Sequence, residues 1–348
     1  LDRIDYLPIE DPGAELSRFR AGELHITETI PPGRHDWLAE NLPEALRIAP
    51  YVGSFWLGLN LSRPPLAGAP DLRRALSLAI DRKRMIETLI PGYATPGIGP
   101  LPPAVWNHDG DLDPDPHDPD RARKLLADAG WRDDDGDGVL DRDGAPFTVE
   151  ILTSVGDPVR ENGSVMLRSF LQEVGVDVRI RAMELAAGLE RLREGRFDAY
   201  FGRLNANLYG DPRGTVHSQA VGEFNFGSYA NATVDSLVDL ALTITDRDEA
   251  RPLWYRLQEL LLEDPPSAYL FYPENLVGRS ARLRDVEPHL LSPINNLAEW
   301  WIAPGDRRSA IRLQDAHVHG GRCRHRGVAA AGLVQELGAQ LDDYLHLV

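Results

Sequence analysis

The sequence predicts an α/β fold with parallel strands, and residues 147–201 carry the evidence. In this region, segments of alternating polar and apolar residues, typical of strands, take turns with segments whose apolar residues recur at helical spacing. We expect strands at 147–153, 176–183 and 197–201, and helices at 158–174 and 186–194. Because a helix follows each of the first two strands, the strands should be parallel, with the helices packed on the sheet.

A helix should precede this region and begin at Asp118, whose carboxylate can accept hydrogen bonds from the first free amides. Pro119 stands where its missing N–H costs nothing, and Gly130 provides the stop. Between them, apolar residues recur at helical spacing, and Trp131 follows as a large apolar side chain.

The rest of the chain up to residue 276 continues the alternation. Residues 51–61 alternate apolar side chains and predict a strand, and Asp71 starts a helix with an apolar stripe that ends at Ile80. The following segment, 91–117, is rich in proline and predicts an irregular loop. Two leucine-rich helices at 232–243 and 247–263 and a strand at 268–272 complete the pattern.

Composition bounds the class of protein. The 348 residues include 37 basic and 54 acidic side chains, a net charge of −17, which argues against nucleic acid or an anionic lipid surface as a partner. No apolar run reaches membrane-spanning length. Cys323 is the only cysteine, so the chain has no internal disulfide.

Several motifs in a fixed order resemble family 5 of the extracytoplasmic solute-binding proteins, which serve ABC importers of peptides, nickel and related solutes. The unit at 118–154, DPDRARKLLADAGW followed by DGDG and a strand, is similar to the family pattern, as is LRRALSLAIDR at 72–82. Asp211-Pro212 and the Tyr229-Ala230-Asn231 triplet with Asp235 extend the resemblance, which covers residues 1 to about 303.

The resemblance implies a periplasmic-binding-protein-like (type II) two-lobe fold. Residues 1–60 and 277–303 would form part of lobe I, residues 61–276 would form lobe II, and residues 304–348 would be an extra tail of uncertain structure. Because the resemblance begins partway through the family pattern, we expect the first lobe to be incomplete and an N-terminal segment to precede Leu1.

The resemblance also implies a function. The chain would be the substrate-binding component of an ABC importer, capturing a peptide-like or other small polar solute by hinge closure at Asn60 and delivering it to the permease subunits. It would be periplasmic or at the cell surface, held to the membrane only by a lipid anchor upstream of this chain. No catalytic activity and no cofactor are expected, because the sequence holds no G-x-S-x-G, P-loop or Gly-rich dinucleotide turn.

Ligands of open α/β sheets bind beyond the carboxyl ends of strands, so the loop at 202–212 is the predicted site. It resembles the family's W..DYpDP pattern but has Asn205 at the tryptophan position and Leu208 at the aspartate position. In peptide-binding relatives that aspartate holds the ligand's amino terminus, so a blocked peptide or an oligosaccharide fits better. The candidate ligand-binding residues are Arg203, Asn205, Asn207, Leu208, Tyr209, Asp211, Tyr229 and Asn60. Asn205 and Asn207 fit equally well as turn formers.

The acidic turn at 133–144 has two interpretations. Counted from Asp133, oxygen ligands at Asp133, Asp135, Asp137 and Asp141 and a glycine at position 6 follow a calcium loop. Gly144 stands where the bidentate glutamate belongs, which favours a β-hairpin whose Asp-Gly pairs supply positive φ angles.

Two other functions stay open. Asp315, His317 and His319 match an amidohydrolase pattern, and with Cys323 and His325 they allow a metal-dependent hydrolase or a mixed His/Cys site. Such a metal pair belongs at the start of a barrel, for which too few residues remain. The second alternative is an intracellular sensor that reuses the solute-binding fold.

Overall fold

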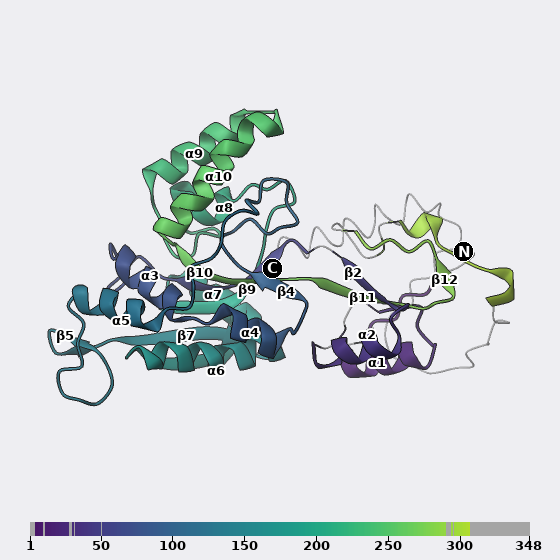
Figure 1. The fold of residues 1–348 in the computed structure, drawn as a ribbon, viewed down its shortest axis with the longest axis horizontal. Coiled ribbons are helices and arrows are strands. Elements are labelled where there is room, and N and C mark those ends of the chain that lie inside the picture. The colour runs from purple at the N-terminus through teal and green to yellow at the C-terminus, as the bar shows by residue number, and fades with distance from the viewer. Residues whose placement is uncertain are drawn as a thin grey trace. The chain divides into compact units, whose positions relative to one another are not determined.

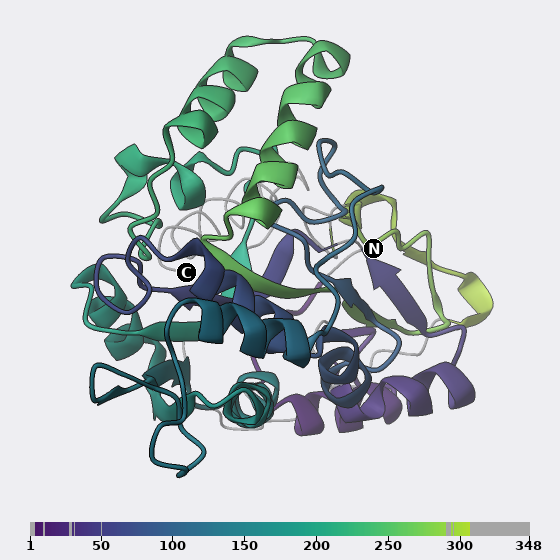
Figure 2. The ribbon, with the colours of Figure 1, turned by 60° about the vertical axis from the view of Figure 1, so that its left-hand side comes forward.

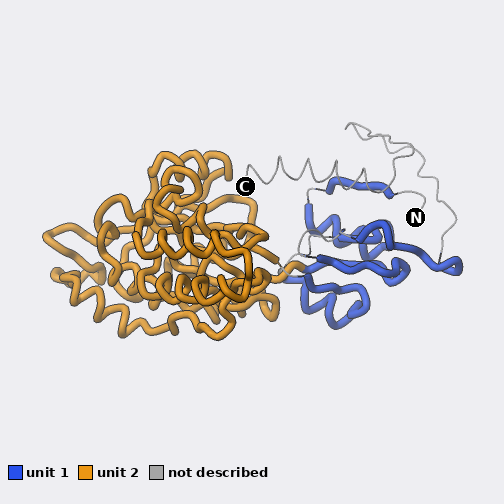
Figure 3. Tube along the Cα trace, turned by 90° about the horizontal axis from the view of Figure 1, so that it is seen from above, with its two compact units in different colours: residues 1–49, 276–348 blue, residues 50–275 orange. Residues whose placement is uncertain are grey.

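The structure, a computed structural model, describes residues 4–9, 11–27, 30, 32–49, 51–289, 294 and 296–306 of the chain. The chain divides into two compact units, which Figure 3 shows in different colours. Unit 1 comprises Leu1–Ala49 and Leu276–Val348, and unit 2 comprises Pro50–Asn275. The predicted lobe boundaries at 60/61 and 276/277 stay a prediction.

Unit 2 is built on a six-stranded sheet with the strand order β4-β10-β3-β9-β7-β8 (Figure 1). Its strands are β3 (Gly53–Leu59), β4 (Ala94–Pro96), β7 (Thr148–Ser154), β8 (Asp177–Met183), β9 (Ala199–Asn205) and β10 (Ser267–Pro273). As predicted, β7 lies parallel to both β8 and β9. The other three strands pair antiparallel, β3 with β9, β10 with β3 and β4 with β10.

Strand β3 lies elsewhere than the sequence suggested. We expected residues 51–61 to leave the first lobe through a hinge at Asn60, but β3 is a central strand of the unit 2 sheet. All seven of its residues pair with β9, from Gly53 opposite Asn205 to Leu59 opposite Ala199. Every residue of β3 is buried, because β9 and β10 flank it in the sheet and the core helices pack on the face of Phe55 and Leu57.

One face of this sheet carries the main core. Phe55, Leu57, Ile151 and Phe201 point into it and meet the apolar sides of four helices. These are α3 (Pro70–Ala79), α4 (Arg82–Leu89), α5 (Pro119–Asp128) and α6 (Pro158–Glu173). The helices begin where predicted: the carboxylates of Asp118 and Asp157 accept hydrogen bonds from the first free amides of α5 and α6.

The opposite face of the sheet has a smaller apolar cluster around Trp56, Leu152, Tyr200 and Tyr269. Helix α7 (Leu185–Arg193) packs on it through Leu192. Strand and helix periodicity therefore predicted the α/β layers correctly, and alternation along β7 divides its side chains between the two faces.

A helical pair forms a further part of unit 2, and Figure 2 shows it standing away from the sheet. Helices α9 (Ala232–Thr243) and α10 (Arg247–Glu263) pack on each other around Trp254, together with the short α8 (Arg213–Val216) and the 3₁₀ turn Ser218–Ala220. Both long helices have the bounds that leucine spacing predicted.

Unit 1 has shorter elements. Its three-stranded sheet has the order β1-β11-β2, with β1 (Ile26–Thr27), β2 (Leu46–Ala49) and β11 (Asn275–Arg279), and β12 (Leu283–Arg284) pairs with β13 (Trp301–Ile302). Its helices are α1 (Pro12–Arg20) and α2 (His35–Asn41), with 3₁₀ turns at Pro32–Arg34, Leu297–Glu299 and Pro304–Asp306. Leu16, Phe19 and Leu38 are buried within this unit.

Candidate ligand-binding edge of the unit 2 sheet

The carboxyl end of β9 presents an exposed arginine on an aromatic support. The Arg203 guanidinium lies 4.8 Å from the centroid of the Tyr51 ring and 5.9 Å from that of Phe55, and it donates to the Tyr51 hydroxyl. A guanidinium over an aromatic face is attracted by the negative charge of the ring face. The head group of Arg203 is therefore held in one place although the residue is exposed.

Asn205 completes the group. The Tyr51 hydroxyl donates to Asn205 Oδ1 at 2.6 Å, so Tyr51, Arg203 and Asn205 form one hydrogen-bonded set, which we call the Arg203 cluster. Gly53 makes room for it, because a Cβ at position 53 would lie 2.2 Å from the Tyr51 ring. With Oδ1 engaged by Tyr51, the Asn205 amide group offers N–H donors.

Tyr51 is not among the ligand-binding residues that the sequence predicts. It lies 154 residues before Asn205, and the two meet because β3 and β9 pair along their whole length and Ala206 N donates to Val52 O at 2.6 Å. The only signal was its position as the first residue of the strand predicted over residues 51–61.

The loop that follows β9 is fixed by turns of its own and by contacts with residues 106 and 107. Asn207 Oδ1 accepts from the Tyr209 amide at 2.7 Å, and Asp211 Oδ1 accepts from the Arg213 amide at 2.8 Å. Trp106 Nε1 donates to Tyr209 O at 2.9 Å. Asn207 and Asp211 thus form turns, while Tyr209 is 82% exposed.

The same loop exposes Leu208, which is 41% accessible. Of the predicted ligand residues, Arg203 and Asn205 therefore lie together with Tyr51. Leu208 and Tyr209, a few residues further along the chain, are exposed on the surface. The apolar Leu208 side chain offers no charge to a ligand.

Asn60 and Tyr229, also predicted as ligand contacts, are 2% exposed and have structural partners. Asn60 Nδ2 donates to Phe197 O at 2.8 Å and to Gly195 O at 3.1 Å, which ties the end of β3 to the start of β9. The Tyr229 hydroxyl donates to Asp264 Oδ2 at 3.2 Å. Burial and the negative charge of Asp264 raise the pKa of Tyr229. Neither side chain is accessible within unit 2.

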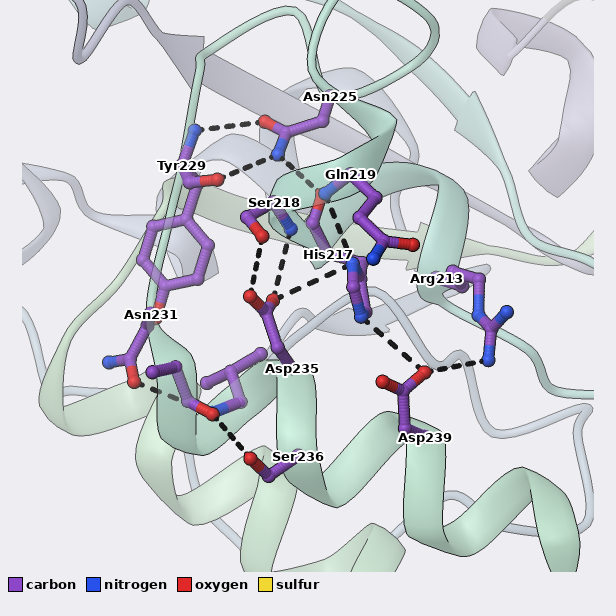
Figure 4. Close-up of polar contacts among 12 residues, drawn as sticks. Arg213, His217, Ser218, Gln219, Asn225, Tyr229, Asn231, Asp235, Ser236 and Asp239 are labelled. Atoms are coloured by element: carbon purple, nitrogen blue, oxygen red, sulfur yellow. Dashed lines mark hydrogen bonds and ion pairs between the residues drawn. The ribbon is translucent and has the colours of Figure 1, made fainter.

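The Tyr229–Asp235 segment holds the loop before it against α9 (Figure 4). Asn225 binds Tyr229 through both backbone groups, and Asn231 caps α9 by accepting from the amides of Thr233 and Val234. Asp235 accepts from the Ser218 amide at 3.0 Å and from its hydroxyl at 2.5 Å. The motif that carried the resemblance is thus a structural one.

The acidic turn forms a hairpin. Asp143 and Gly144 have φ angles of 56° and 74° and connect β5 (Asp141–Arg142) to β6 (Ala145–Pro146). One carboxylate oxygen from each of Asp133, Asp135 and Asp137 lies within 4.8 Å of the others, and all three side chains are exposed. The Asp133 carboxylate accepts from the amides of Gly136 and Gly138, so it already closes the turn. Calcium binding here stays a prediction.

The tail motif at Asp315, His317 and His319, with Cys323 and His325, lies outside the described residues. Within the described ranges, no helix combines the length and hydrophobicity needed to cross a membrane.

Sequence comparison decides the family. The profile of the bacterial extracellular solute-binding proteins, family 5 (middle region), matches residues 1–224. The chain belongs to this family. Membership confirms the resemblance read from the motifs and the predicted extracytoplasmic localisation, and the family consists of solute-binding proteins, not enzymes.

Similar proteins include the oligopeptide-binding protein AppA of Bacillus subtilis, 27% identical over 309 residues, which are 87% of this chain and 56% of AppA. The glutathione-binding protein GsiB of Pectobacterium atrosepticum is 28% identical over 294 residues, 81% of this chain and 54% of GsiB. The chain thus spans about half the length of these curated relatives.

Solved structures confirm the type II periplasmic-binding fold. AppA from Bacillus subtilis in complex with a nonapeptide has a TM-score of 0.74 at 26% identity, covering 85% of this chain and 59% of AppA. NikZ from Campylobacter jejuni in complex with Ni(L-His) has a TM-score of 0.72 at 21% identity, covering 84% of this chain and 60% of NikZ, and supports the fold alone.

Proposed function

We propose that this chain is part of the substrate-binding component of an ABC importer, which captures a small polar solute outside the membrane and delivers it to permease subunits. Family membership supports the class of function. The observation that carries a binding role for unit 2 is the Arg203 cluster, an exposed cation and amide held in place at the carboxyl end of β9. We propose further that the protein has no catalytic activity, in line with its family.

The chemistry of the Arg203 cluster favours oxygen-rich ligands. A guanidinium has five N–H donors in a planar fork, and its contact with the Tyr51 hydroxyl uses only part of them. Arg203 and the Asn205 amide therefore present donors to carboxylate, carbonyl or hydroxyl oxygens. Fixing these side chains before the ligand arrives lowers the entropy cost of binding.

Leu208 restricts the ligand class. A free peptide amino terminus that leaves water needs a paired carboxylate, because an unpaired buried charge costs several kcal/mol. Leu208 cannot supply one, and the Asp211 carboxylate accepts from the Arg213 amide to hold its own turn. We therefore propose a ligand without a free amino terminus at this position, such as a blocked peptide or an oligosaccharide.

The test is a calorimetric panel on the full-length protein with free and N-acetylated di- to pentapeptides, glutathione and oligosaccharides. For the tightest ligand, Arg203→Gln should weaken binding at least tenfold, about 1.4 kcal/mol. Arg121→Gln, an exposed arginine on α5, is the matched control and should leave the affinity unchanged.

Two results would count against the proposal. Free peptides that bind tenfold tighter than their acetylated forms would reject the ligand class. An Arg203→Gln affinity equal to that of Arg121→Gln would remove the Arg203 cluster from the site.

A further inference from the structure

A second polar feature lies at the opposite end of the same strands. A hollow of about 340 Å³ opens where β7, β8 and β9 begin, and its charged lining residues are Arg63, Arg179, Arg191, Arg196, Glu150 and Asp198. The residues come from the segment after β3, from β7 and β8, from α7 and from the segment before β9. Nothing in the proposed importer function uses it.

Strand register explains why these groups share one face. Glu150 pairs with Arg179, and the pairing of Ile151 with Ala199 places Glu150 beside Asp198. Neighbouring residues in register point to the same side of a sheet, here the side covered by α7. Asp198, directly before β9, lies seven positions from Asn205 at the end of that strand, roughly 23 Å at the usual rise per residue, so the hollow is distinct from the Arg203 cluster.

The lining carries excess positive charge. Four arginines against two carboxylates leave a net +2. Including Arg181, Asp177 and Glu194 at the rim still leaves +1, in a chain whose total is −17. The charge of this region is therefore opposite in sign to the net charge of the chain.

The arginines also have donors to spare. Arg191 and Arg181 approach Glu150 at 3.8 and 3.7 Å, distances too long for hydrogen bonds. Arg191 Nε is buried and has no hydrogen-bond partner among the described residues. Arg179 and Arg196 pair with Asp177 and Glu194, but their side chains remain 71% and 59% exposed.

We propose that this hollow binds a small anion bearing a phosphate group. Guanidinium groups that reach it from several separate segments suit the tetrahedral oxygens of a phosphate, whereas a planar carboxylate is satisfied by one bidentate arginine. The lining charge of +2 complements a dianion. The volume exceeds that of a phosphate alone and leaves room for the group esterified to it.

The experiment is calorimetry of the purified full chain with inorganic pyrophosphate at low ionic strength. The double variant Arg179→Gln/Arg196→Gln should lower the affinity at least tenfold, and the control Arg121→Gln should not change it. Glu150→Gln should raise the affinity severalfold, because it removes a negative charge from the lining. Circular dichroism establishes that each variant is folded, and Glu150→Gln tests the proposal even if the double variant fails to fold.

A vesicle arm distinguishes the source of the phosphate. We expect no co-sedimentation with phosphatidylglycerol vesicles, because the charge of −17 repels an anionic surface. Co-sedimentation that the double variant abolishes would instead identify a lipid head group as the ligand. Failure to bind either probe, binding lost equally in Arg121→Gln, or weaker binding in Glu150→Gln would overturn the proposal.

Discussion

Units 1 and 2 differ in how much apolar surface their described residues bury. Unit 2 has a continuous core between four helices and a sheet with five seven-residue strands, whereas strands in unit 1 have two to five residues. One apolar cluster among the described residues of unit 1 centres on Leu283, Val286 and Trp300. Because stability grows with the apolar area that folding buries, the cooperative part of the protein should be unit 2.

Unit 2 also encloses buried arginines whose guanidinium groups are hydrogen-bonded or paired. In unit 2, Arg82 donates to Tyr269 O and to both oxygens of Ser77, and burial lowers its pKa to about 10. Arg73 pairs with Asp264 while its side chain is only 6% exposed. A core that encloses satisfied guanidinium groups specifies one arrangement of its elements, since any other leaves buried donors unpaired.

The largest expected effect is proteolytic. Limited digestion should leave a resistant fragment from about residue 50 to 275, because unit 2 buries its strands while unit 1 presents short elements to the protease. Mass spectrometry of the digest gives the boundaries. Preferential survival of residues 11–49 would reverse the comparison.

A substitution in the core of unit 2 should have the second largest effect. Phe147 is fully buried and stacks on Trp131 at a centroid distance of 4.5 Å. Phe147→Ala should destabilise unit 2 by about 3–5 kcal/mol in urea denaturation. Leu240→Ala, at a residue 52% exposed, should stay within about 0.5 kcal/mol. Leu38→Ala, at a buried residue of unit 1, should leave the unfolding transition of unit 2 unchanged. A shift of the unit 2 transition in this variant would show that the two units unfold together.

Acid should weaken both units through separate histidines. Burial lowers the pKa of His108 in unit 2 and of His35 in unit 1. Each imidazole ring lies within hydrogen-bonding distance of a backbone carbonyl oxygen. In the unfolded chain each histidine takes up a proton near pH 6.5, whereas in the folded protein it does so only at lower pH. The free energy of unfolding is therefore unaffected by these histidines above about pH 6.5 and decreases as the pH falls toward the folded pKa.

The slope cannot exceed about 1.4 kcal/mol per pH unit for one histidine. His108→Gln should flatten the pH dependence of unit 2 alone between pH 5 and 7, and His35→Gln that of unit 1 alone. Denaturation monitored separately for each unit checks this, and an unchanged slope in His108→Gln would assign the dependence to other groups.

The smallest effect concerns the carboxylates of the acidic turn, since Asp133, Asp135 and Asp137 are all exposed. Desolvation and the charges of Asp135 and Asp137 raise the pKa of Asp141, and the missing twelfth ligand leaves only weak calcium binding. One millimolar calcium should stabilise unit 2 by no more than about 0.5 kcal/mol. A micromolar affinity by calorimetry, abolished in Asp135→Ala, would restore the calcium-loop interpretation.

Local pattern was enough for most elements of unit 2. The apolar spacing of α5, α6, α9 and α10, the capping residue Asp118 and the alternation along β7 and β8 all depend on neighbours within a few residues. The rule that ligands bind beyond strand ends also singled out the segment that carries Arg203 and Asn205, whose role in ligand binding stays a prediction.

Contacts between distant segments had to come from the tertiary structure. The sequence by itself determined the α/β class and the family, because these depend on periodicity and short motifs. It placed a loop at 202–212, whereas β9 continues to Asn205 because residues 202–205 pair with β3. The structure decided that β3 lies inside the sheet, that Tyr51 supports Arg203, that Asn60 and Tyr229 are buried, and that arginines from four segments surround one hollow. Strand register and burial arise from pairing across tens of residues between β7, β8 and β9 and across more than a hundred between β3 and β9, and no local pattern encodes which partner a strand will meet.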